Sequence, residues 1–472
     1  MTNSFHHDAT AAGRLEATVI RNGYCVGCGA CASIMAAPFQ MKMNHHGQYE
    51  AQRIPILQSA HATIDVQTVC PFSDEALTED QLAQPLYGDV CDRDSNAGYF
   101  FSVYSGYVAE GDFRARGSSG GFGTWIVHEL FKLDLIDYVI HVQPLPPSDD
   151  NGPLFVYTIS DSSDSIRDGA KSRYYPIELS SVLHSVRDRP GRYAFVGLPC
   201  FIKSVRLLQR QDPVFKERIK YCVGLVCGHL KSTRYAESLA WQIGIDPLAL
   251  KSFDFRVKDD HAPADRYCVS ASDGEQEMIS TASDLFGTDW GAGAFKYKSC
   301  DFCDDVFSET ADVVLGDAWL PQFVNDSKGT NILIIRNPDI HKLLDTASKC
   351  GRIDVQELPI ALAVASQAGG LRHRKDAIAY RLYSEKKDNC WTPRKRPAPL
   401  IFLFPRFERK RQDLRAQLRK LSHDAFDVAR NKNDIAFFLD QMKPLYREYR
   451  AINGDILGRI ISLARRKLRQ IP

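Results

Sequence analysis

Two spacings of apolar residues alternate along the middle of the chain. From about residue 98 onward, short apolar runs typical of buried strands are separated by segments with the apolar spacing of amphipathic helices. The segment 122–133 predicts one such helix, and strands are expected at 139–142, 155–159, 312–315 and 332–335. Strands that alternate with helices predict a largely parallel sheet with helices on its faces, within an α+β chain.

Two further strands are each followed by a cysteine and then by a helix. The strand at 193–198 leads to Cys200 and a helix at 202–209, and the strand at 219–226 leads to Cys227 and a helix near 234–243. If these strands are neighbours, both thiols face one crevice at the strand ends, where open α/β sheets bind ligands. The helix N-termini would also stabilise the negative charge of thiolates.

The strongest local motif lies before this region, in the sequence CVGCGAC at 25–31. Three cysteines at steps of three can surround one face of a cubane cluster, and a fourth followed by proline, as Cys70 is, completes ferredoxin-type sites. Met35 stands where a continuous ferredoxin run would place its next cysteine, so the motif predicts one 4Fe–4S cluster. A zinc site is the alternative, but zinc normally takes paired C-x2-C elements far apart in sequence.

A second set of cysteines is dispersed along the chain. Cys300 and Cys303 add two thiols to Cys200 and Cys227, which makes a second group of four. Spacing alone leaves two alternatives open, half of a zinc site and buried cysteines that act as small apolar fillers. Among the other cysteines, Cys222 is interpreted as core; the rest lack partners at ligand spacing and are Cys91, Cys268, Cys350 and Cys390.

Composition is that of a soluble globular protein, with 44% apolar and 25% charged residues. No run approaches the roughly 18 apolar residues of a membrane span, and residues 1–16 lack the apolar core of a secretory signal. We therefore expect a cytoplasmic chain with reduced thiols, in which 13 cysteines indicate metal binding or catalysis rather than disulfides.

Charge is divided unevenly between the two ends. Residues 391–472 hold 20 Lys and Arg against 8 Asp and Glu, whereas the whole chain has a net charge of +1. After a linker at 393–405, the segment 455–469 predicts a helix with an apolar stripe flanked by arginines. Such a helix can make weak contact with an anionic membrane surface at the inner face. Packing of the stripe on the protein is the favoured alternative, because the stripe is short and has no aromatic anchor.

Three segments have residues suited to a phosphate-bearing cofactor. Ser118, Ser119, Gly120 and Gly121 lead into a helix, where backbone N–H groups bind phosphate; a simple Ser-capped helix is the alternative. The run 171–175 offers two cations and two aromatic rings, or else forms a solvated basic turn. Asp317 follows one strand and Thr330 precedes another, so either lines a cofactor or belongs to a plain turn.

Together, these segments resemble the beta-subunit family of coenzyme F-420 hydrogenases and dehydrogenases. That family includes 7-hydroxymethyl chlorophyll a reductase and bacterial proteins encoded with surface-polysaccharide genes. The matching text spans about residues 20–340 and comprises CVGCGAC at 25–31, SSGGFGTWIVHEL at 118–130, SRYYP at 172–176, VGLPCFIKSVRLL at 196–208, GLVCGHLKS at 224–232, KSCDFCDDVFSETADVVLGDAWLP at 298–321 and GTNILIIRN at 329–337.

The resemblance implies two 4Fe–4S clusters and one FAD. One cluster would be held by Cys25, Cys28, Cys31 and Cys70, and the other by Cys200, Cys227, Cys300 and Cys303. The FAD-binding candidates are Ser118, Ser119, Gly120, Gly121, Lys171, Ser172, Arg173, Tyr174, Asp317 and Thr330. The implied organisation is a flexible N-terminus at 1–24, a ferredoxin-like segment at 25–97, a mixed α/β domain for FAD and the second cluster at 98–390, and a linker with a basic helical tail at 391–472.

The implied function is that of an iron–sulfur flavoprotein oxidoreductase. Electrons from ferredoxin or another carrier protein would reach a small-molecule substrate, with surface-polysaccharide biosynthesis as one setting; no nucleic-acid partner is expected. Two alternatives stay open, a coenzyme F-420-dependent beta subunit and a non-catalytic relay subunit of a larger complex. The tail past residue 390 has no counterpart in the archaeal subunits, which argues against coenzyme F-420 itself. His229 is the candidate proton donor, and a structural role is its alternative.

Overall fold

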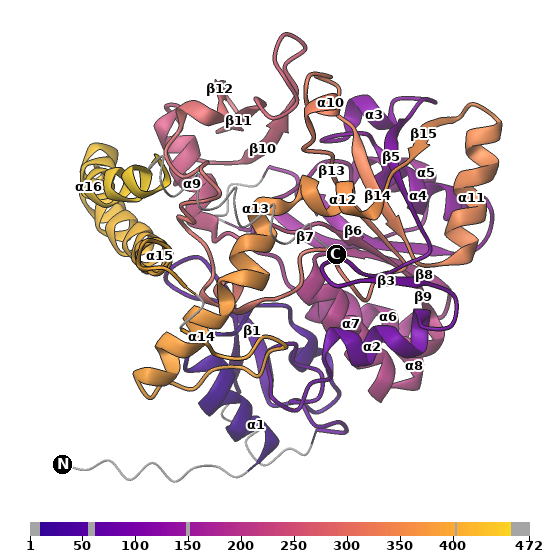
Figure 1. Cartoon of the computed structure of the whole chain (residues 1–472), viewed down its shortest axis with the longest axis horizontal. Helices are drawn as coiled ribbons and strands as arrows, with labels where there is room; N and C mark the ends of the chain where they lie inside the picture. Colours follow the sequence, from indigo (N-terminus) through magenta and orange to yellow (C-terminus); the bar gives the residue numbers. More distant parts are fainter. Residues whose placement is uncertain (1–9, 55–61, 148–151, 402–403, 455–472) are drawn as a thin grey trace.

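The computed structural model describes residues 10–54, 62–147, 152–401 and 404–454. An eight-stranded sheet lies at its centre, in the strand order β15-β5-β14-β13-β9-β8-β6-β7 (Figure 1). The strands are β5 (Ser102–Val108), β6 (Tyr138–Pro144), β7 (Phe155–Ser160), β8 (Tyr193–Gly197), β9 (Ile219–Leu225), β13 (Val313–Asp317), β14 (Asn331–Ile335) and β15 (Ile353–Glu357).

The sheet is mixed rather than largely parallel. Strands β6, β8, β9 and β13 run parallel in the middle, whereas β7 at one edge and β14, β5 and β15 at the other pair antiparallel. The predicted parallel sheet is therefore correct for the centre and wrong for both edges. The apolar runs of β7 and β14 resemble those of the central strands, so the sequence pattern does not reveal their direction, whereas the edge strand β15 is largely exposed.

Helices cover both faces because alternate side chains of each strand point in opposite directions. Val313 and Leu315 pack on one face, and Val314 between them packs on the other. One face carries α4 (Phe122–Lys132), α5 (Ser163–Asp168) and α11 (Pro338–Lys349); the other carries α6 (Ser180–Asp188), α7 (Pro199–Gln211) and α8 (Pro213–Arg218). The helices predicted at 122–133 and 202–209 are confirmed, and the interpretation of Cys222 as core is confirmed by its burial in β9.

The N-terminal segment wraps one side of this core (Figure 1). It contains α1 (Ala11–Leu15), a π-helical turn (Glu16–Ile20), a 3-10 turn (Ala30–Ser33) and the hairpin of β1 (Phe39–Met43) and β2 (Tyr49–Arg53). Further on come α2 (Glu79–Tyr87), β3 (Asp92–Asp94) and β4 (Gly98–Phe100). The expectation of a flexible N-terminus is wrong for residues 11–20, because Leu15 and Val19 are each only 1% exposed and anchor this helical segment.

A second, three-stranded antiparallel sheet was not predicted. It is formed by β10 (Ser252–Val257), β11 (Cys268–Ser272) and β12 (Glu277–Thr281). Before it in the chain comes α9 (Thr233–Gln242), which confirms the helix expected near 234–243. Charged residues interrupt the apolar pattern of β10, because Arg256 and Asp254 sit among its phenylalanines.

The C-terminal part is helical. It consists of α12 (Ile360–Ser366), α13 (Ala368–Leu371), a π-helical turn (Arg372–Asp376), α14 (Ile378–Lys387), α15 (Arg406–Lys432) and α16 (Ile435–Gly454). Helices α15 and α16 form a hairpin (Figure 1, yellow) that packs on the protein through Phe426 and Phe438, both against Phe295. The predicted helical tail is confirmed over these helices.

The proposed membrane-facing helix at 455–469 lies outside the described residues. Within the described part of the chain, no helix is long and apolar enough to cross a bilayer.

Candidate functional site

The four cysteines of the first set converge, although Cys70 lies far from the others in sequence. Burial raises the pKa of the Cys31 thiol well above its usual range, and the other three thiols of the set raise it further when ionised. Cys28 and Cys31 are buried, whereas Cys25 and Cys70 are half-buried. The structure therefore brings the four predicted ligands together, with two of them close to the surface.

Two glycines allow the chain to fold tightly around these thiols. Gly27 and Gly29 have φ values of +71° and +82°, which side-chain-bearing residues rarely adopt. A Cβ atom at Gly27 would also lie 2.5 Å from the carbonyl oxygen of Tyr49, and one at Gly29 would lie 2.6 Å from Glu178 Oε2. The backbone N–H of Ala51 donates a hydrogen bond to Cys25 Sγ at 3.4 Å.

The second set is assembled by the central sheet. Strands β8 and β9 are parallel neighbours, as the sequence pattern required, and they end beside Cys200 and Cys227. Cys300 and Cys303 come from a 3-10 turn (Lys298–Phe302) and the residue after it. Burial raises the pKa of Cys200 well above its usual range, and the other three thiols of this set add to the increase. The dispersed set is therefore one cluster of sulfurs in space.

Polar groups of the protein point at the sulfurs of this second set. The Arg374 guanidinium donates to Cys303 Sγ at 3.3 Å and to Cys227 Sγ at 3.6 Å, and its side chain is almost fully buried. The backbone N–H of Leu230 donates to Cys300 Sγ at 3.2 Å. A buried cation that contacts two sulfurs is suited to thiolates rather than to neutral thiols.

The two sets lie next to each other. Ionised Cys28, of the first set, raises the pKa of Cys200, of the second. Both of these thiols also raise the pKa of Tyr157, after burial as the main cause. A charge on one set therefore acts electrostatically on the other, so the two sets are close to each other. Electron transfer between two metal groups requires such proximity.

Neither set has the spacing of a zinc site. Thiolates that surround one zinc ion at about 2.3 Å lie roughly 3.8 Å from one another. Within the described ranges, the only group of three or more His, Cys, Asp or Glu ligand atoms that lie within 4.8 Å of one another is His45, His46 and Asp427. Among the described residues, no three thiols of either set therefore lie within 4.8 Å of one another, which is a wider separation than one zinc ion needs. The donor sets fit iron–sulfur clusters.

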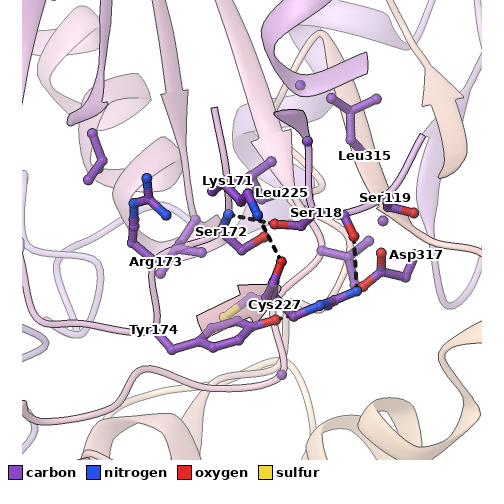
Figure 2. A pocket seen from close by; sticks show the side chains of 18 of the residues that line it. Ser118, Ser119, Lys171, Ser172, Arg173, Tyr174, Leu225, Cys227, Leu315 and Asp317 are labelled. Atoms are coloured by element: carbon purple, nitrogen blue, oxygen red, sulfur yellow. Dashed lines mark hydrogen bonds and ion pairs between the residues drawn. The ribbon is translucent and has the colours of Figure 1, made fainter. Parts of the chain in front are cut away.

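A cavity of about 580 Å³ opens beside the second set. Eight of the sequence-predicted residues line it: Ser118, Ser119, Gly121, Lys171, Ser172, Arg173, Tyr174 and Asp317 (Figure 2). Cys227 lines it as well. Its volume is in the range of small-molecule and cofactor sites. One wall of the cavity is therefore a thiol of the second set, and another is the group of residues suited to a phosphate-bearing cofactor.

Hydrogen bonds fix the two phosphate-suited segments against each other. The Ser172 backbone N–H donates to Ser118 Oγ at 2.8 Å, and Ser119 Oγ donates to the Thr330 carbonyl at 2.9 Å. Gly121 precedes α4 with a φ of +91°, and Gly123 in its first turn also lines the cavity. The N-terminus of α4 therefore borders the cavity, with its positive dipole end available to an anion.

Sequence reasoning missed Arg256, which connects several of these residues. Its guanidinium donates to Asp317 Oδ2 at 3.0 Å, to the Tyr174 hydroxyl at 3.2 Å and to the Ser118 carbonyl at 3.2 Å. Asp317 therefore holds Arg256 in place rather than standing as an isolated turn residue. Only the alternation of side chains along β10 could have pointed to Arg256. That alternation is hard to recognise, because β10 mixes charged and aromatic residues.

Three predicted residues do not line the cavity. Gly120 faces the sheet, because a Cβ atom there would lie 2.7 Å from the Gly106 carbonyl oxygen. Thr330 is buried and contributes its carbonyl to Ser119. His229 is buried with its ring 4.5 Å from that of Trp290, which does line the cavity. Burial and nearby cations, Lys231 first among them, lower the pKa of His229 well below its usual range.

Two adjoining segments of the chain match described protein families. Residues 103–184 match the family described as coenzyme F420 hydrogenase/dehydrogenase, beta subunit N-term, and residues 191–360 match the C-terminal family of the same subunit. Together the matches cover more than half of the 472 residues. They include all four cysteines of the second set and every cavity residue except Gln367 and Gly370, but neither the first set nor Arg374.

Among solved structures, the chain is similar to one from the F420-reducing [NiFe] hydrogenase complex of Methanosarcina barkeri. The identity is 14% and the TM-score is 0.48, over 62% of this chain and 96% of that one. No curated protein matches the chain.

Proposed function

This chain belongs to the coenzyme F420 hydrogenase/dehydrogenase beta-subunit family, and we propose that it is an iron–sulfur flavoprotein oxidoreductase. The family is one of iron–sulfur oxidoreductases. In this proposal each cysteine set holds one 4Fe–4S cluster and the cavity holds FAD. When bound, the clusters supply one-electron transfer, and the flavin couples it to two-electron chemistry on a substrate.

One observation carries the proposal: Cys227 belongs to the second cysteine set and also lines the cavity. A group held by the second set would thus lie against whatever occupies the cavity. Because Cys28 influences Cys200, the first set adjoins the second in turn. In this proposal the second set lies between the first set and the cavity.

The half-buried thiols indicate where electrons enter. Cys25 and Cys70 are the more accessible members of the first set, whereas three of the four cysteines in the second set are buried. We propose that ferredoxin, or another electron-carrier protein, docks near Cys25 and Cys70. The second set would then receive electrons through the first.

The cavity residues have separate roles in this proposal. Ser118, Ser119 and the N-terminus of α4 would bind the FAD pyrophosphate, with Lys171 and Arg173 supplying positive charge. Lys171 is held in place by an ion pair with Asp254 at 2.9 Å. Arg256 is neutralised by Asp317, so its main role is to fix the Ser118 and Tyr174 segments relative to each other. Tyr174 and Trp290, with ring centroids 4.8 Å apart, offer an aromatic surface.

The direct test is the cofactor content of chain purified without oxygen. We expect about eight iron and eight sulfide per chain, together with about one FAD. Stoichiometric zinc with negligible sulfide would overturn the assignment of iron–sulfur clusters. About eight iron per chain without flavin would support the two clusters but refute the assignment of FAD to the cavity.

A second measurement separates the rival functions. Chain reduced without oxygen is mixed with candidate small molecules, and reoxidation of the flavin absorbance is followed. Oxidation by a small molecule alone supports a catalytic chain, and oxidation by coenzyme F420 would favour the deazaflavin alternative. Reoxidation only by a partner protein would favour a relay subunit.

A further inference from the structure

Two histidines and a carboxylate come together where the turn between β1 and β2 meets α15. In sequence, all three residues lie outside the segments that line the cavity. The ligand atoms of His45, His46 and Asp427 all lie within 4.8 Å of one another. His46 Nδ1 is 2.9 Å from Asp427 Oδ2, between residues 381 positions apart in the chain. The centroids of the two histidine rings are 3.8 Å apart. The group therefore joins the N-terminal segment to the C-terminal hairpin.

The turn that presents the histidines is held rigidly. Asn44 Oδ1 accepts hydrogen bonds from the backbone N–H groups of His46 and Gln48, each at 3.1 Å. The N–H of Thr233 donates to the Gly47 carbonyl at 2.9 Å, and Arg234 donates to the His45 carbonyl at 2.6 Å. A binding group fixed by its surroundings loses little freedom when it takes a ligand.

The charges around the group favour a further cation. Arg234 forms ion pairs with both Glu237 at 2.8 Å and Asp427 at 3.2 Å. Its single positive charge therefore balances only one of these two negative charges. Arg430 also approaches Glu237, at 3.6 Å. A third carboxylate, Asp424, has its Oδ1 3.8 Å from His46 Nε2. Three carboxylates thus face two guanidinium groups.

We propose that His45, His46 and Asp427 bind one zinc-class divalent cation. Two imidazole nitrogens and a carboxylate oxygen are ligands that Zn²⁺ prefers. The ion would replace the proton shared between His46 Nδ1 and Asp427, and water would complete the coordination. Arg234 would stay on the other oxygen of Asp427 and orient the carboxylate, as outer partners of metal ligands do.

The ion would fasten the C-terminal hairpin to the segment that carries the first cysteine set. Strand β2 begins three residues after His46, and its Ala51 N–H donates to Cys25 Sγ. On the other side, α15 packs on the protein through Phe426, the neighbour of Asp427. An ion bound only by the assembled hairpin and turn stabilises the folded chain by mass action.

The test uses full-length chain with its native cofactors, prepared without oxygen, dialysed against EDTA and then titrated with Zn²⁺. His6 and His7 are replaced by alanine throughout, since adjacent histidines also bind zinc. We expect one zinc per chain after gel filtration and a higher thermal unfolding midpoint. His45→Ala and Asp427→Asn should each weaken zinc binding at least about 10-fold and abolish the thermal shift. Loss of even a residue that only orients a metal ligand lowers metal affinity by about that factor.

His261→Ala is the matched control, because it removes an exposed histidine elsewhere in the chain and should leave both effects intact. His45 is itself exposed, so its loss should not prevent folding, which iron content and far-UV circular dichroism would verify. Zinc uptake with unchanged affinity in both variants would overturn the proposal, as would no uptake by the parent chain.

Discussion

The two cysteine sets reach the same kind of arrangement by opposite routes. In the first set, three of four cysteines lie within seven residues, and glycines of positive φ let the chain fold around them. In the second set, four cysteines spread over about a hundred residues are assembled by two parallel strands and a separate turn. A compact motif can be recognised without a fold, whereas a dispersed one becomes a site only through the sheet that assembles it.

The polar surroundings of the sets differ as well. Cys25 accepts from the backbone N–H of Ala51, whereas Cys227 and Cys303 face the buried guanidinium of Arg374. Hydrogen bonds and positive charge near cluster sulfurs stabilise the reduced state. We therefore expect the second cluster to have the higher reduction potential, so that electrons move from the first set toward the cavity.

The largest expected effect separates the two sets by their iron. Cys28→Ala should remove about half of the iron, and Cys303→Ala should remove the other half, because each deletes one of four ligands. Colorimetric iron and sulfide assays on anaerobically purified variants check this result. Cys350→Ala, at an exposed cysteine, is the control and should retain all iron. If both ligand variants lost the same half of the iron, the division into two sets would be wrong.

A second substitution tests the cavity without touching either set. Gly123 lies in the first turn of α4 and lines the cavity, and a Cβ atom there meets nothing closer than Leu315 at 3.9 Å. Gly123→Asp places a carboxylate beside the FAD phosphates, so repulsion should weaken FAD binding by more than about tenfold. Flavin fluorescence after release, measured alongside iron, gives the occupancy.

The isosteric variant Gly123→Asn is the control for this substitution, and it should retain clearly more flavin than the aspartate. Equal occupancy in the two variants would mean that the phosphates bind elsewhere. Gly120→Asp would be a poorer test, because the added side chain would collide with the backbone of β5.

A smaller effect is expected at Arg374. Arg374→Met should lower the reduction potential of the second cluster by at least about 60 mV, a tenfold change for one electron, while the first cluster keeps its potential. A redox titration followed by electron paramagnetic resonance measures both. Arg374→Lys retains the positive charge but lacks the paired guanidinium donors. Its second cluster should therefore have a reduction potential between those of the parent chain and of Arg374→Met. A uniform shift of both clusters would indicate a general structural disturbance instead.

The smallest effect is a pH dependence at Lys258. Burial, helped by Arg114, Lys171 and Arg256, lowers the pKa of Lys258 to about 8, and its ammonium donates to the Ser119 carbonyl at 3.0 Å. The positive charge is present below that pH and is lost as the pH rises through it. FAD should therefore bind about two- to fivefold more weakly at pH 9 than at pH 7.

Flavin titrations at both pH values check this change in affinity. Lys258→Arg should bind FAD equally at the two values, because a guanidinium stays charged. A change in affinity that persisted in Lys258→Met would have to come from another group.

The sequence predicted the strands and helices around Cys200 and Cys227 of the second set, because their apolar runs are unmixed and β8 and β9 each end shortly before one of these cysteines. Eight of the ten cofactor candidates line the cavity, although most of its other lining residues had no signal in the sequence. Arg256 and Arg374 could not be found in this way. Each acts through tertiary contacts, and Arg374 lies in a π-helical turn some seventy residues beyond the nearest cysteine of the set.

The antiparallel edges of the main sheet escaped prediction for a related reason. Apolar runs indicate that a strand is buried but carry no information about its direction. Gly120 faces the sheet and Thr330 is buried, so neither lines the cavity beside it, which spacing alone does not reveal.

The most direct test of two adjoining clusters in series is the electron paramagnetic resonance spectrum of the fully reduced chain. Because the Cys28 thiolate acts on the pKa of Cys200, the two clusters should be close enough for their spins to interact when both are reduced. We predict a complex, split signal that collapses to that of a single isolated cluster in Cys28→Ala. Two simple, independent signals in the parent chain, or one cluster's signal alone, would contradict the account.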